Sequence, residues 1–491
     1  MSSRLRLTAL LTAAAAFGAV GSASADPDGF GPFPPQNPAT ATNGVATMHG
    51  DSASSDTTPD AGPGTGAVTS SRTALASACP TVVIGSDGYP VTLCTTIFGQ
   101  TPTVHLLDPR TGADLASLSL AKGNLFGGVY TYLDNGDDLV VVDGDDNLLR
   151  IGHHLRSDGD WSLTVDQSTS LASAVPAGDS VVGLSPGWDG KVWFATQGGV
   201  VGTVDTTTGT VRALALPAGE QVDNSISTVP GYTAVATDHA LYLLTEAADG
   251  TPQIDWRAPY DRGPGRKPGQ LSWGTGATPS FFGPGNGTEY VTITDNAAPH
   301  ENLLVFDTTG APGPAGSATP STPVQVCATP VLTQYPQSGT EDAVIASGRS
   351  VFVTDTYGYP YPALPSGAPA SVPSSASFQG GMTRVDVNAD GDGCSVVWNS
   401  DVPSAALPRL SLGDDRIYTV TATGPMGLAG SDTFAGYHYA VVDPATGQEL
   451  SSSLLGIGLL DNPLQMTGTT GPDGTLYQGT ETGVVEVRAE S

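Results

Sequence analysis

The sequence has little positive charge and, after its first 25 residues, no long apolar stretch. It holds 18 Lys and Arg against 48 Asp and Glu, a formal net charge of −30 that repels nucleic acids and anionic membranes. No later apolar run is long enough to span a bilayer as a helix. No long stretch shows a helical period, so we expect little helix. We therefore expect neither nucleic acid nor a membrane as a partner.

The first 25 residues have the pattern of a secretory signal peptide. Arg4 and Arg6 precede an apolar run, and the small residues Ala23-Ser24-Ala25 come before the expected cleavage point. Residues 26–78 hold mainly Pro, Gly, Ser, Thr and Ala, with too few large apolar side chains to offset the entropy of ordering. We therefore predict a secreted, extracellular protein with a flexible leader at 26–78 and one folded domain at 79–491.

A short hairpin pattern recurs along the predicted domain. Each copy joins an apolar strand end, an Asp that can bond its own backbone two residues on, and a Gly that can take a positive φ. The copies are Asp108–Gly112, Asp205–Gly209, Asp307–Gly310 and Asp443–Gly447. Repetition at blade-like spacing predicts a β-propeller.

The number of blades follows from the turns. Each blade should have a first hairpin, between its first and second strands, and a second hairpin, between its third and fourth strands. Turns of second hairpins number seven, including the four copies above, and the chain ends after the third strand of its last unit. First-hairpin turns number eight: Ser86–Gly88, Asp134–Gly136, Trp188–Gly190, Pro230–Gly231, Pro284–Gly287, Ser347–Gly348, Gly413–Asp415 and Pro472–Gly474. We predict an all-β protein, a single propeller of eight four-stranded antiparallel blades, with seven as the alternative. An N-terminal strand would complete the last blade and remove its free edge.

Only four cysteines are present, with no C-x-x-C motif and no vicinal pair, so a redox motif is not supported. In an exported protein an even number suggests disulfides, and three connectivities are possible. Cys79 and Cys94 fall where two neighbouring strands of the first blade should lie, which favours their pairing. Cys327 and Cys394 would then bridge adjacent blades.

The region from about Cys79 to Arg488 resembles the quinoprotein-type (PQQ-like) β-propeller superfamily, and more narrowly a group of exported bacterial propellers of unassigned function. The narrower resemblance is carried by Trp193–Phe194, Gly202–Asp205, Tyr260–Gly263, Lys267–Gln270, Gly274–Pro279, Ile293–Ala297, Gly380–Asp386 and Leu410–Leu412. Superfamily enzymes that use the quinone cofactor usually add tryptophan-docking repeats, a calcium held by Glu, Asn and Asp, and often a vicinal disulfide. This chain has six Trp without that repeat and no vicinal pair, so PQQ is not expected.

Ligands of propellers usually bind at the mouth of the central channel, on the face that carries the connections between blades. The connection between blades four and five, Arg257–Gln270, holds four of the chain's few basic residues. Arg side chains there could clamp a carboxylate or phosphate. The alternative is a structural loop whose Arg residues pair with nearby Asp. The ligand-binding candidates in this loop are Tyr260, Asp261, Arg262, Lys267 and Gln270.

A second candidate group follows the second strand of blade five. Asp295, Asn296 and His300 could bind metal or move protons. The alternative is an Asx turn at the end of a strand, with the histidine in solvent.

A third group lies at the expected channel mouth. Glu341, Asp342 and Arg409 fall near the starts of inner strands, and a Glu–Arg pair there could be catalytic or could join two blades as an ion pair. The long insert Asp355–Phe378, with Tyr357 and Tyr359, would cover the mouth as a lid.

A possible calcium loop lies on the opposite face. Asp386, Asn388 and Asp390 match the first half of a calcium-binding loop, D-x-N-x-D-G. The acid usual at position twelve is replaced by Val397, so an acidic hairpin turn is the alternative.

Two functions of different classes fit this sequence. The first is an exported, monomeric propeller that binds a small polar or anionic molecule, or a partner, at the channel mouth. The second is a hydrolase, lyase or isomerase without an organic cofactor at the same site, with Glu341, Asp295 or His300 as base and Arg262 or Arg409 facing developing negative charge. A PQQ-dependent dehydrogenase is the least favoured.

Overall fold

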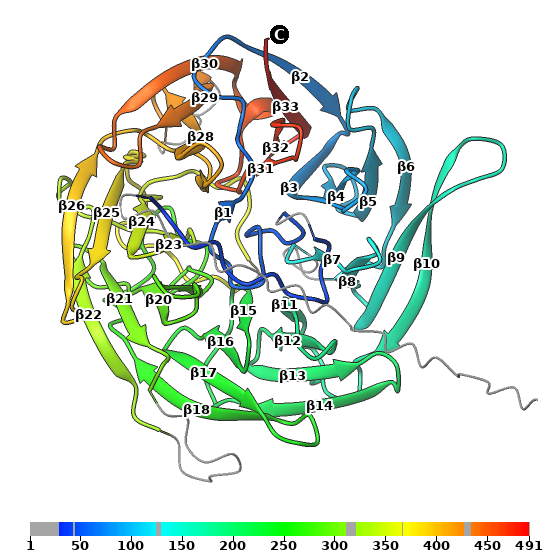
Figure 1. Ribbon diagram of the computed structural model, residues 1–491, viewed down its shortest axis with the longest axis horizontal. Coiled ribbons are helices and arrows are strands. Elements are labelled where there is room, and N and C mark those ends of the chain that lie inside the picture. The colour runs from blue at the N-terminus through cyan, green and yellow to red at the C-terminus, as the bar shows by residue number, and fades with distance from the viewer. Residues whose placement is uncertain are drawn as a thin grey trace, which may run out of the picture.

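Eight β-sheets stand around a central channel like the blades of a propeller (Figure 1). The computed structural model describes residues 29–42, 45–123, 129–310, 321–365, 367–426 and 434–490. The strands of each blade are called A to D from the channel outward. The prediction of eight antiparallel, four-stranded blades is confirmed. The predicted signal peptide lies outside the described residues.

The first four blades each use four consecutive strands. Blade one holds β3 (Ser77–Ile84), β4 (Pro90–Thr96), β5 (Pro102–Leu107) and β6 (Asp114–Ser119). Blade two holds β7 (Tyr132–Leu133), β8 (Leu139–Val142), β9 (Asn147–Leu155) and β10 (Trp161–Ser170). Blade three holds β11 (Val181–Pro186), β12 (Val192–Thr196), β13 (Val200–Asp205) and β14 (Thr210–Ala215). Blade four holds β15 (Ile226–Val229), β16 (Tyr232–Ala236), β17 (Ala240–Glu246) and β18 (Pro252–Pro259).

Blades five to seven repeat this order, and blade eight differs. Blade five holds β19 (Ser280–Phe282), β20 (Tyr290–Thr294), β21 (Asn302–Asp307) and β22 (Val324–Pro330). Blade six holds β23 (Ile345–Ser347), β24 (Ser350–Thr354), β25 (Met382–Val387) and β26 (Cys394–Ser400). Blade seven holds β27 (Arg409–Ser411), β28 (Arg416–Thr423), β29 (Gly436–Val442) and β30 (Glu449–Ile457), followed by the 3₁₀ helix η2 (Leu459–Asp461). Blade eight holds β31 (Thr469–Thr470), β32 (Leu476–Thr480) and β33 (Gly483–Ala489).

The two ends of the chain close the ring in blade eight. Strand β2 (Val68–Ala74) supplies its outermost strand and runs antiparallel to β33, with Val68 opposite Ala489 and Ala74 opposite Gly483. This confirms the prediction that an N-terminal strand completes the last blade, which leaves the ring without an open blade edge. Among the described residues, no helix is long and apolar enough to cross a membrane.

The recurring turns have the chemistry that the sequence predicts. In the turn of blade one, Oδ1 of Asp108 accepts hydrogen bonds from the backbone N–H groups of Arg110 and Thr111, both at 2.9 Å. Gly112 takes a φ of 70° and closes the hairpin. Asp205 and Gly209 repeat both features in blade three. Side-chain bonding and a left-handed glycine therefore set the hairpin register.

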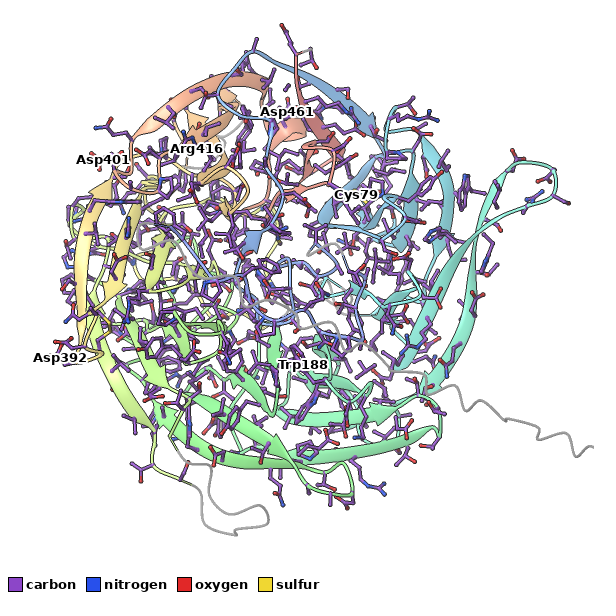
Figure 2. All side chains as sticks on the ribbon, viewed as in Figure 1. Cys79, Trp188, Asp392, Asp401, Arg416 and Asp461 are labelled. Atoms are coloured by element: carbon purple, nitrogen blue, oxygen red, sulfur yellow. A yellow bond between two sulfur atoms is a disulfide. The ribbon has the colours of Figure 1, made fainter. Side chains whose placement is uncertain are left out.

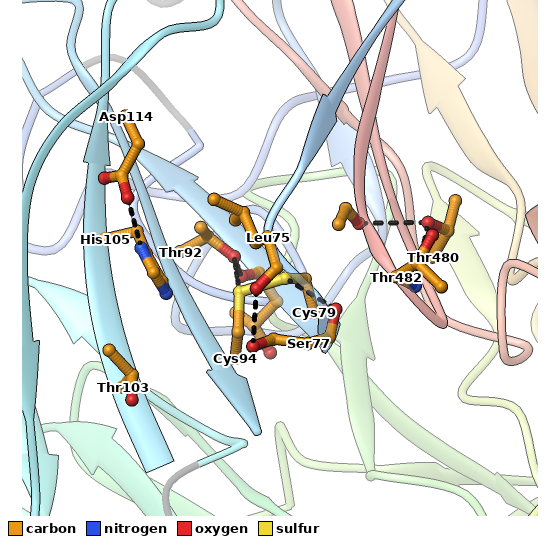
Figure 3. The surroundings of a disulfide bond; sticks show 12 residues. Leu75, Ser77, Cys79, Thr92, Cys94, Thr103, His105, Asp114, Thr480 and Thr482 are labelled. Carbon is orange, nitrogen blue, oxygen red and sulfur yellow. Dashed lines mark hydrogen bonds and ion pairs between the residues drawn. A yellow bond between two sulfur atoms is a disulfide. The ribbon is translucent and has the colours of Figure 1, made fainter. Parts of the chain in front are cut away.

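Both predicted disulfides are present. Cys79 and Cys94 join β3 to β4 within blade one (Figure 3), where both are fully buried. Cys327 and Cys394 join β22 to β26, the outer strands of blades five and six. Disulfides of this kind suit an oxidising, extracellular environment.

The segment predicted as a flexible leader is ordered where the structure describes it. Here residues 29–42 and 45–66 are called the N-terminal arm. Backbone carbonyls of this arm accept hydrogen bonds from the innermost strands of six blades, at 2.7–3.2 Å. These bonds are Ile84 to Val45, Leu133 to Ala46, Thr228 to Ser52, Phe281 to Ala53, Ala346 to Ser55 and Leu410 to Asp56.

The arm fills the channel because its side chains are small. Ser55 to Thr58 are fully buried, and β1 (Thr57–Thr58), labelled near the centre of the ring in Figure 1, pairs in parallel with β27. Inner strands present backbone N–H groups that need partners, and small side chains let the backbone of this part of the arm approach them. The same composition that predicted disorder therefore suits a segment that pairs with the inner strands of six blades.

Candidate functional site

A cavity of about 480 Å³ lies on the face that carries the connections between blades. Its walls come from the connections that follow blades two, three and four and from the B–C loops of blades three and four. The B–C insert of blade six closes it from above, through Pro365 and Pro369. Its polar and aromatic lining includes Asp179, Gln197, Asp223, Asp238, Arg262 and Trp273. We call this space the roofed cavity.

Arg262 is the one predicted site residue that lines the roofed cavity. Its guanidinium donates to Oδ2 of Asp238 at 2.6 Å and contacts Nε2 of His239 at 2.8 Å. The guanidinium carbon also lies 4.3 Å from the ring centre of Trp273. The indole N–H of Trp273 donates to the carbonyl of Arg262 at 3.0 Å, which fixes the ring. Asp238 already balances the charge of Arg262.

The cavity therefore has more negative than positive charge. Oδ1 of Asp179 accepts hydrogen bonds from the N–H groups of Ser180 and Gly198, both at 2.8 Å, so this carboxylate is held by backbone. Burial, together with the charge of Asp238, raises the pKa of Asp223 to about 6. Three carboxyl groups face one guanidinium, which favours neutral or cationic ligands over anions.

Backbone hydrogen bonds hold the insert of blade six, the roof of the cavity, against the connection between blades four and five. The N–H of Val372 donates to the carbonyl of Arg266 at 2.8 Å, and the N–H of Gly358 donates to that of Pro268 at 2.9 Å. Tyr357 and Tyr359, predicted ligand contacts, are buried in the protein instead. Tyr359 packs in an apolar cluster with residues of blade seven, so these rings anchor the roof.

Lys267, Gln270 and Asn296 hold the connection between blades four and five. The ammonium of Lys267 donates to the carbonyl of Ala297 at 2.7 Å and lies 3.3 Å from Oε1 of Glu301. The amide of Gln270 donates to Oδ1 of Asn296 at 3.1 Å and to Glu301 at 3.2 Å. Burial raises the pKa of Glu301 to about 7. This buried network supports the wall and does not line the cavity.

Four other candidates also have structural partners. Oδ1 of Asp295 accepts hydrogen bonds from the backbone of Ala297 and Asn302, which is the Asx-turn alternative. His300 contacts the carbonyl of Tyr335 at 2.8 Å. The hydroxyl of Tyr260 donates to the carbonyl of Thr237, and Asp261 accepts from the N–H of Gly263.

Glu341 and Arg409 do not form the pair that the sequence suggested. Arg409 is fully buried, donates to the carbonyl of Met48 at 2.6 Å and lies 3.7 Å from Asp56, so it holds the N-terminal arm. Burial raises the pKa of Glu341 to about 8. Its Oε1 accepts a 3.4 Å hydrogen bond from Ser272, a residue that lines the roofed cavity. Asp342 is buried as well, and burial raises its pKa well above the ordinary value.

The proposed calcium loop is a hairpin turn in which the three side chains have separate partners. Asp386 forms an ion pair with Arg384 at 2.8 Å. Asn388 accepts a hydrogen bond from Ser395, and Oδ1 of Asp390 accepts one from the N–H of Asp392. Across the described ranges there is no cluster of three His, Cys, Asp or Glu side chains arranged to hold a metal. Calcium binding here remains a prediction.

The residues present do not match the quinone-cofactor arrangement. Neither disulfide is vicinal, because Cys79–Cys94 lies within blade one and Cys327–Cys394 joins two outer strands. On the axis, the arm is packed against the inner strands. We derive no step through this cofactor.

The sequence reasoning missed Asp179, Asp223, Asp238 and Trp273. All four lie in connections or B–C loops on the predicted face, so topology could have marked them. The clustered basic residues pointed instead to the connection between blades four and five.

No family model matches the chain. An uncharacterized protein of Archaeoglobus fulgidus is 33% identical over 126 residues, which cover 25% of this chain and 24% of that protein. The match thus spans about a quarter of that relative. Among solved structures, quinohemoprotein alcohol dehydrogenase from Comamonas testosteroni is 12% identical with a TM-score of 0.49, covering 92% of this chain and 82% of that one. A streptogramin B lyase is 11% identical with a TM-score of 0.40, covering 86% and 98%. The chain's own eight sheets define it as a β-propeller.

Proposed function

We propose that the protein is an exported β-propeller that binds a small polar molecule in the roofed cavity. The main observation is that this cavity exists ready-made: its roof is hydrogen-bonded in place, and its polar side chains are held by backbone and by one another. Preformed concave sites with a few oriented polar groups are the usual form of small-molecule sites. The two disulfides and the signal-like N-terminus support export.

The ligand of this proposal is polar rather than anionic. Arg262, which the sequence suggested as an anion clamp, already pairs with Asp238. Asp179 and Asp223 add negative charge without a matching cation on the cavity wall. A neutral molecule with several hydroxyl or amide groups can donate to these carboxylates and stack against Trp273.

A catalytic role at the same cavity is the second candidate. Ser272 lies between the cavity and Glu341, and its hydroxyl donates to that carboxyl group. With its pKa raised to about 8 by burial, Glu341 carries a proton at neutral pH. For Glu341 to serve as an acid, the Ser272 hydroxyl turns toward the bound molecule and gives up its own proton while Ser272 Oγ accepts the proton of Glu341. The chemistry would be hydrolysis, elimination or isomerisation of the bound molecule.

A thermal-shift screen of neutral polar metabolites tests binding. A compound that binds the native protein at 100 times its Kd stabilises it by about 2.7 kcal/mol. We expect hits that stabilise the protein and that lose their effect in Asp223→Asn and in Trp273→Ala. Asp249→Asn, an equal charge change in an exposed turn on the opposite face, is the control. Compounds that stabilise both cavity variants as much as the unmodified protein would contradict the proposal. If a hit is turned over and Glu341→Gln abolishes the turnover, the result would favour the enzyme.

A further inference from the structure

A second recess, of about 360 Å³, opens on the opposite face between blades three and four. It lies between the A–B hairpins of these blades and the C–D hairpin of blade four. Trp188, Trp193 and Tyr232 line it, so it holds two of the six Trp in the chain. Trp193 is 4% exposed and forms the floor, whereas Trp188 and Tyr232 are partly exposed. Aromatic side chains are thus concentrated here in a chain with few of them.

The propeller repeat shows that the turn does not require Trp188. The Gly-x-Asp-Gly turn of Gly187–Gly190 occurs again in blade one and in blade eight, with Ser86 and Pro472 at the position of Trp188. In all three turns the N–H of the first Gly donates to the carbonyl four residues on, so the turn forms without an aromatic ring at this position. Figure 2 shows Trp188 in the inner half of the ring, on the blades drawn in green. An aromatic residue at a position that the fold leaves free is more typical of recognition than of folding.

Charged groups of both signs line the same recess. The ammonium of Lys191 forms ion pairs with Asp189 and with Glu246, so it joins the hairpins of the two blades. Lys191 would repel a cationic ligand, and the carboxylates of Asp189 and Glu246 would repel an anionic one. A neutral ligand with several hydroxyl groups can accept from Lys191 and donate to Glu246.

We propose that this recess binds a neutral saccharide. The flat C–H face of one sugar ring packs against Trp188 and Tyr232, since rings of this kind bury much apolar area and keep a polar edge for hydrogen bonds. The hydroxyl groups of the sugar contact Lys191 and Glu246 at the rim. This site is separate from the roofed cavity and does not depend on the function proposed for it.

Calorimetric titration of the full-length protein with four neutral tetrasaccharides tests the proposal: cellotetraose, xylotetraose, maltotetraose and N-acetylchitotetraose. We expect at least one to bind, and sorbitol, which has hydroxyl groups but no ring face, not to bind. Trp188→Ser gives the turn the residue that blade one carries at this position, so it should fold normally. This variant should weaken binding by about tenfold or more, because aromatic contacts contribute beyond the area that they bury.

Three further variants separate this recess from other sites. Lys191→Met should also weaken binding, because it removes the rim donor and leaves the aromatic residues in place. Trp273→Ala tests whether the sugar binds in the roofed cavity instead. Phe98→Ser, which removes an exposed aromatic ring from blade one, should bind the saccharide as the unmodified protein does. No binding of any of the four sugars would overturn the proposal. Equal binding of sorbitol, unchanged binding by Trp188→Ser, or loss confined to Trp273→Ala would overturn it as well.

Discussion

Among single residues, Arg409 holds the N-terminal arm in the channel through a buried charge. Its side chain is 1% exposed and pairs with Asp56 of the N-terminal arm, whose side chain is fully buried. Burial lowers the pKa of the Arg409 guanidinium, and the neighbouring carboxylates of Asp56 and Asp51 oppose this change. Asp56 also contacts Nδ1 of His49 at 2.9 Å, so the three side chains form one buried group in which each compensates the others for the loss of water.

We expect Arg409→Met to destabilise the protein by about 3–5 kcal/mol, because the buried carboxylate of Asp56 then keeps only its contact with His49 and the carbonyl of Met48 loses its donor. Chemical denaturation measures this change. Arg416→Met is the control. Arg416, the half-buried first residue of β28, donates to the carbonyl of its neighbour Asp415, and substitutions near the surface usually change stability by less than about 0.5 kcal/mol. Equal effects of the two substitutions would show that the pair with Asp56 does not carry this role.

At the level of elements, the N-terminal arm connects the blades through their inner strands. Strand β2 completes blade eight, and residues before it pair with the inner strands of six other blades. Hairpins, by contrast, join strands that are close in the sequence. The arm therefore supplies contacts between blades that the hairpins cannot supply.

Deleting residues 26–66 while keeping β2 should expose the inner strands. The backbone N–H groups of Leu133, Thr228, Phe281 and Ala346 lose their carbonyl partners, and a buried donor left unpaired costs about 1–3 kcal/mol. We expect hydrogen exchange to become much faster at these amides. The outer strand β14 should keep its protection, because it pairs within blade three. Unchanged exchange at the inner strands would contradict this role of the arm.

Over the whole molecule, buried carboxyl groups set the dependence of stability on pH. Burial raises the pKa of Glu341 to about 8, of Glu301 to about 7 and of Asp51 to about 6. It also raises the pKa values of Asp342 and Asp355 well above the ordinary range. A carboxyl group whose pKa is higher in the folded state stabilises the protein at low pH. That stabilisation is lost as the pH rises through the folded-state value.

The melting temperature should therefore increase as the pH falls from about 8 to about 5. Lower net charge acts in the same direction, because the chain carries −30 at neutral pH. Glu341→Gln separates the two effects: it keeps a neutral side chain at every pH and should flatten the upper part of this dependence. Asp249→Asn removes a full negative charge at an exposed turn and should leave this part of the dependence unchanged. A melting temperature that rises from pH 5 to pH 8 would contradict the assignment.

Lys267 and Gln270 show how far a predicted site residue can be placed from sequence. The sequence correctly places both in the connection between blades four and five, on the face that carries the cavity. Their side chains, however, point to Glu301, more than thirty positions away in the chain. Position along a repeat predicts the face on which a residue lies. Which way its side chain turns depends on partners that only the packing of blades brings near.

The sequence by itself determined the local features of this protein and their repetition. Asp108 and Gly112 fix a hairpin through bonds within five residues. Because turns are local, eight first hairpins and seven second hairpins could be counted, and the four cysteines could be paired. Tertiary structure decided what depends on distant partners. Small residues around Ser55 became ordered because inner strands of other blades offered them N–H groups, and Asp223 faces a cavity because an insert of blade six covers it. Short-range hydrogen bonds depend on residues that are close in the sequence, so the sequence predicts them. Burial and its electrostatic consequences arise only when the ring has closed.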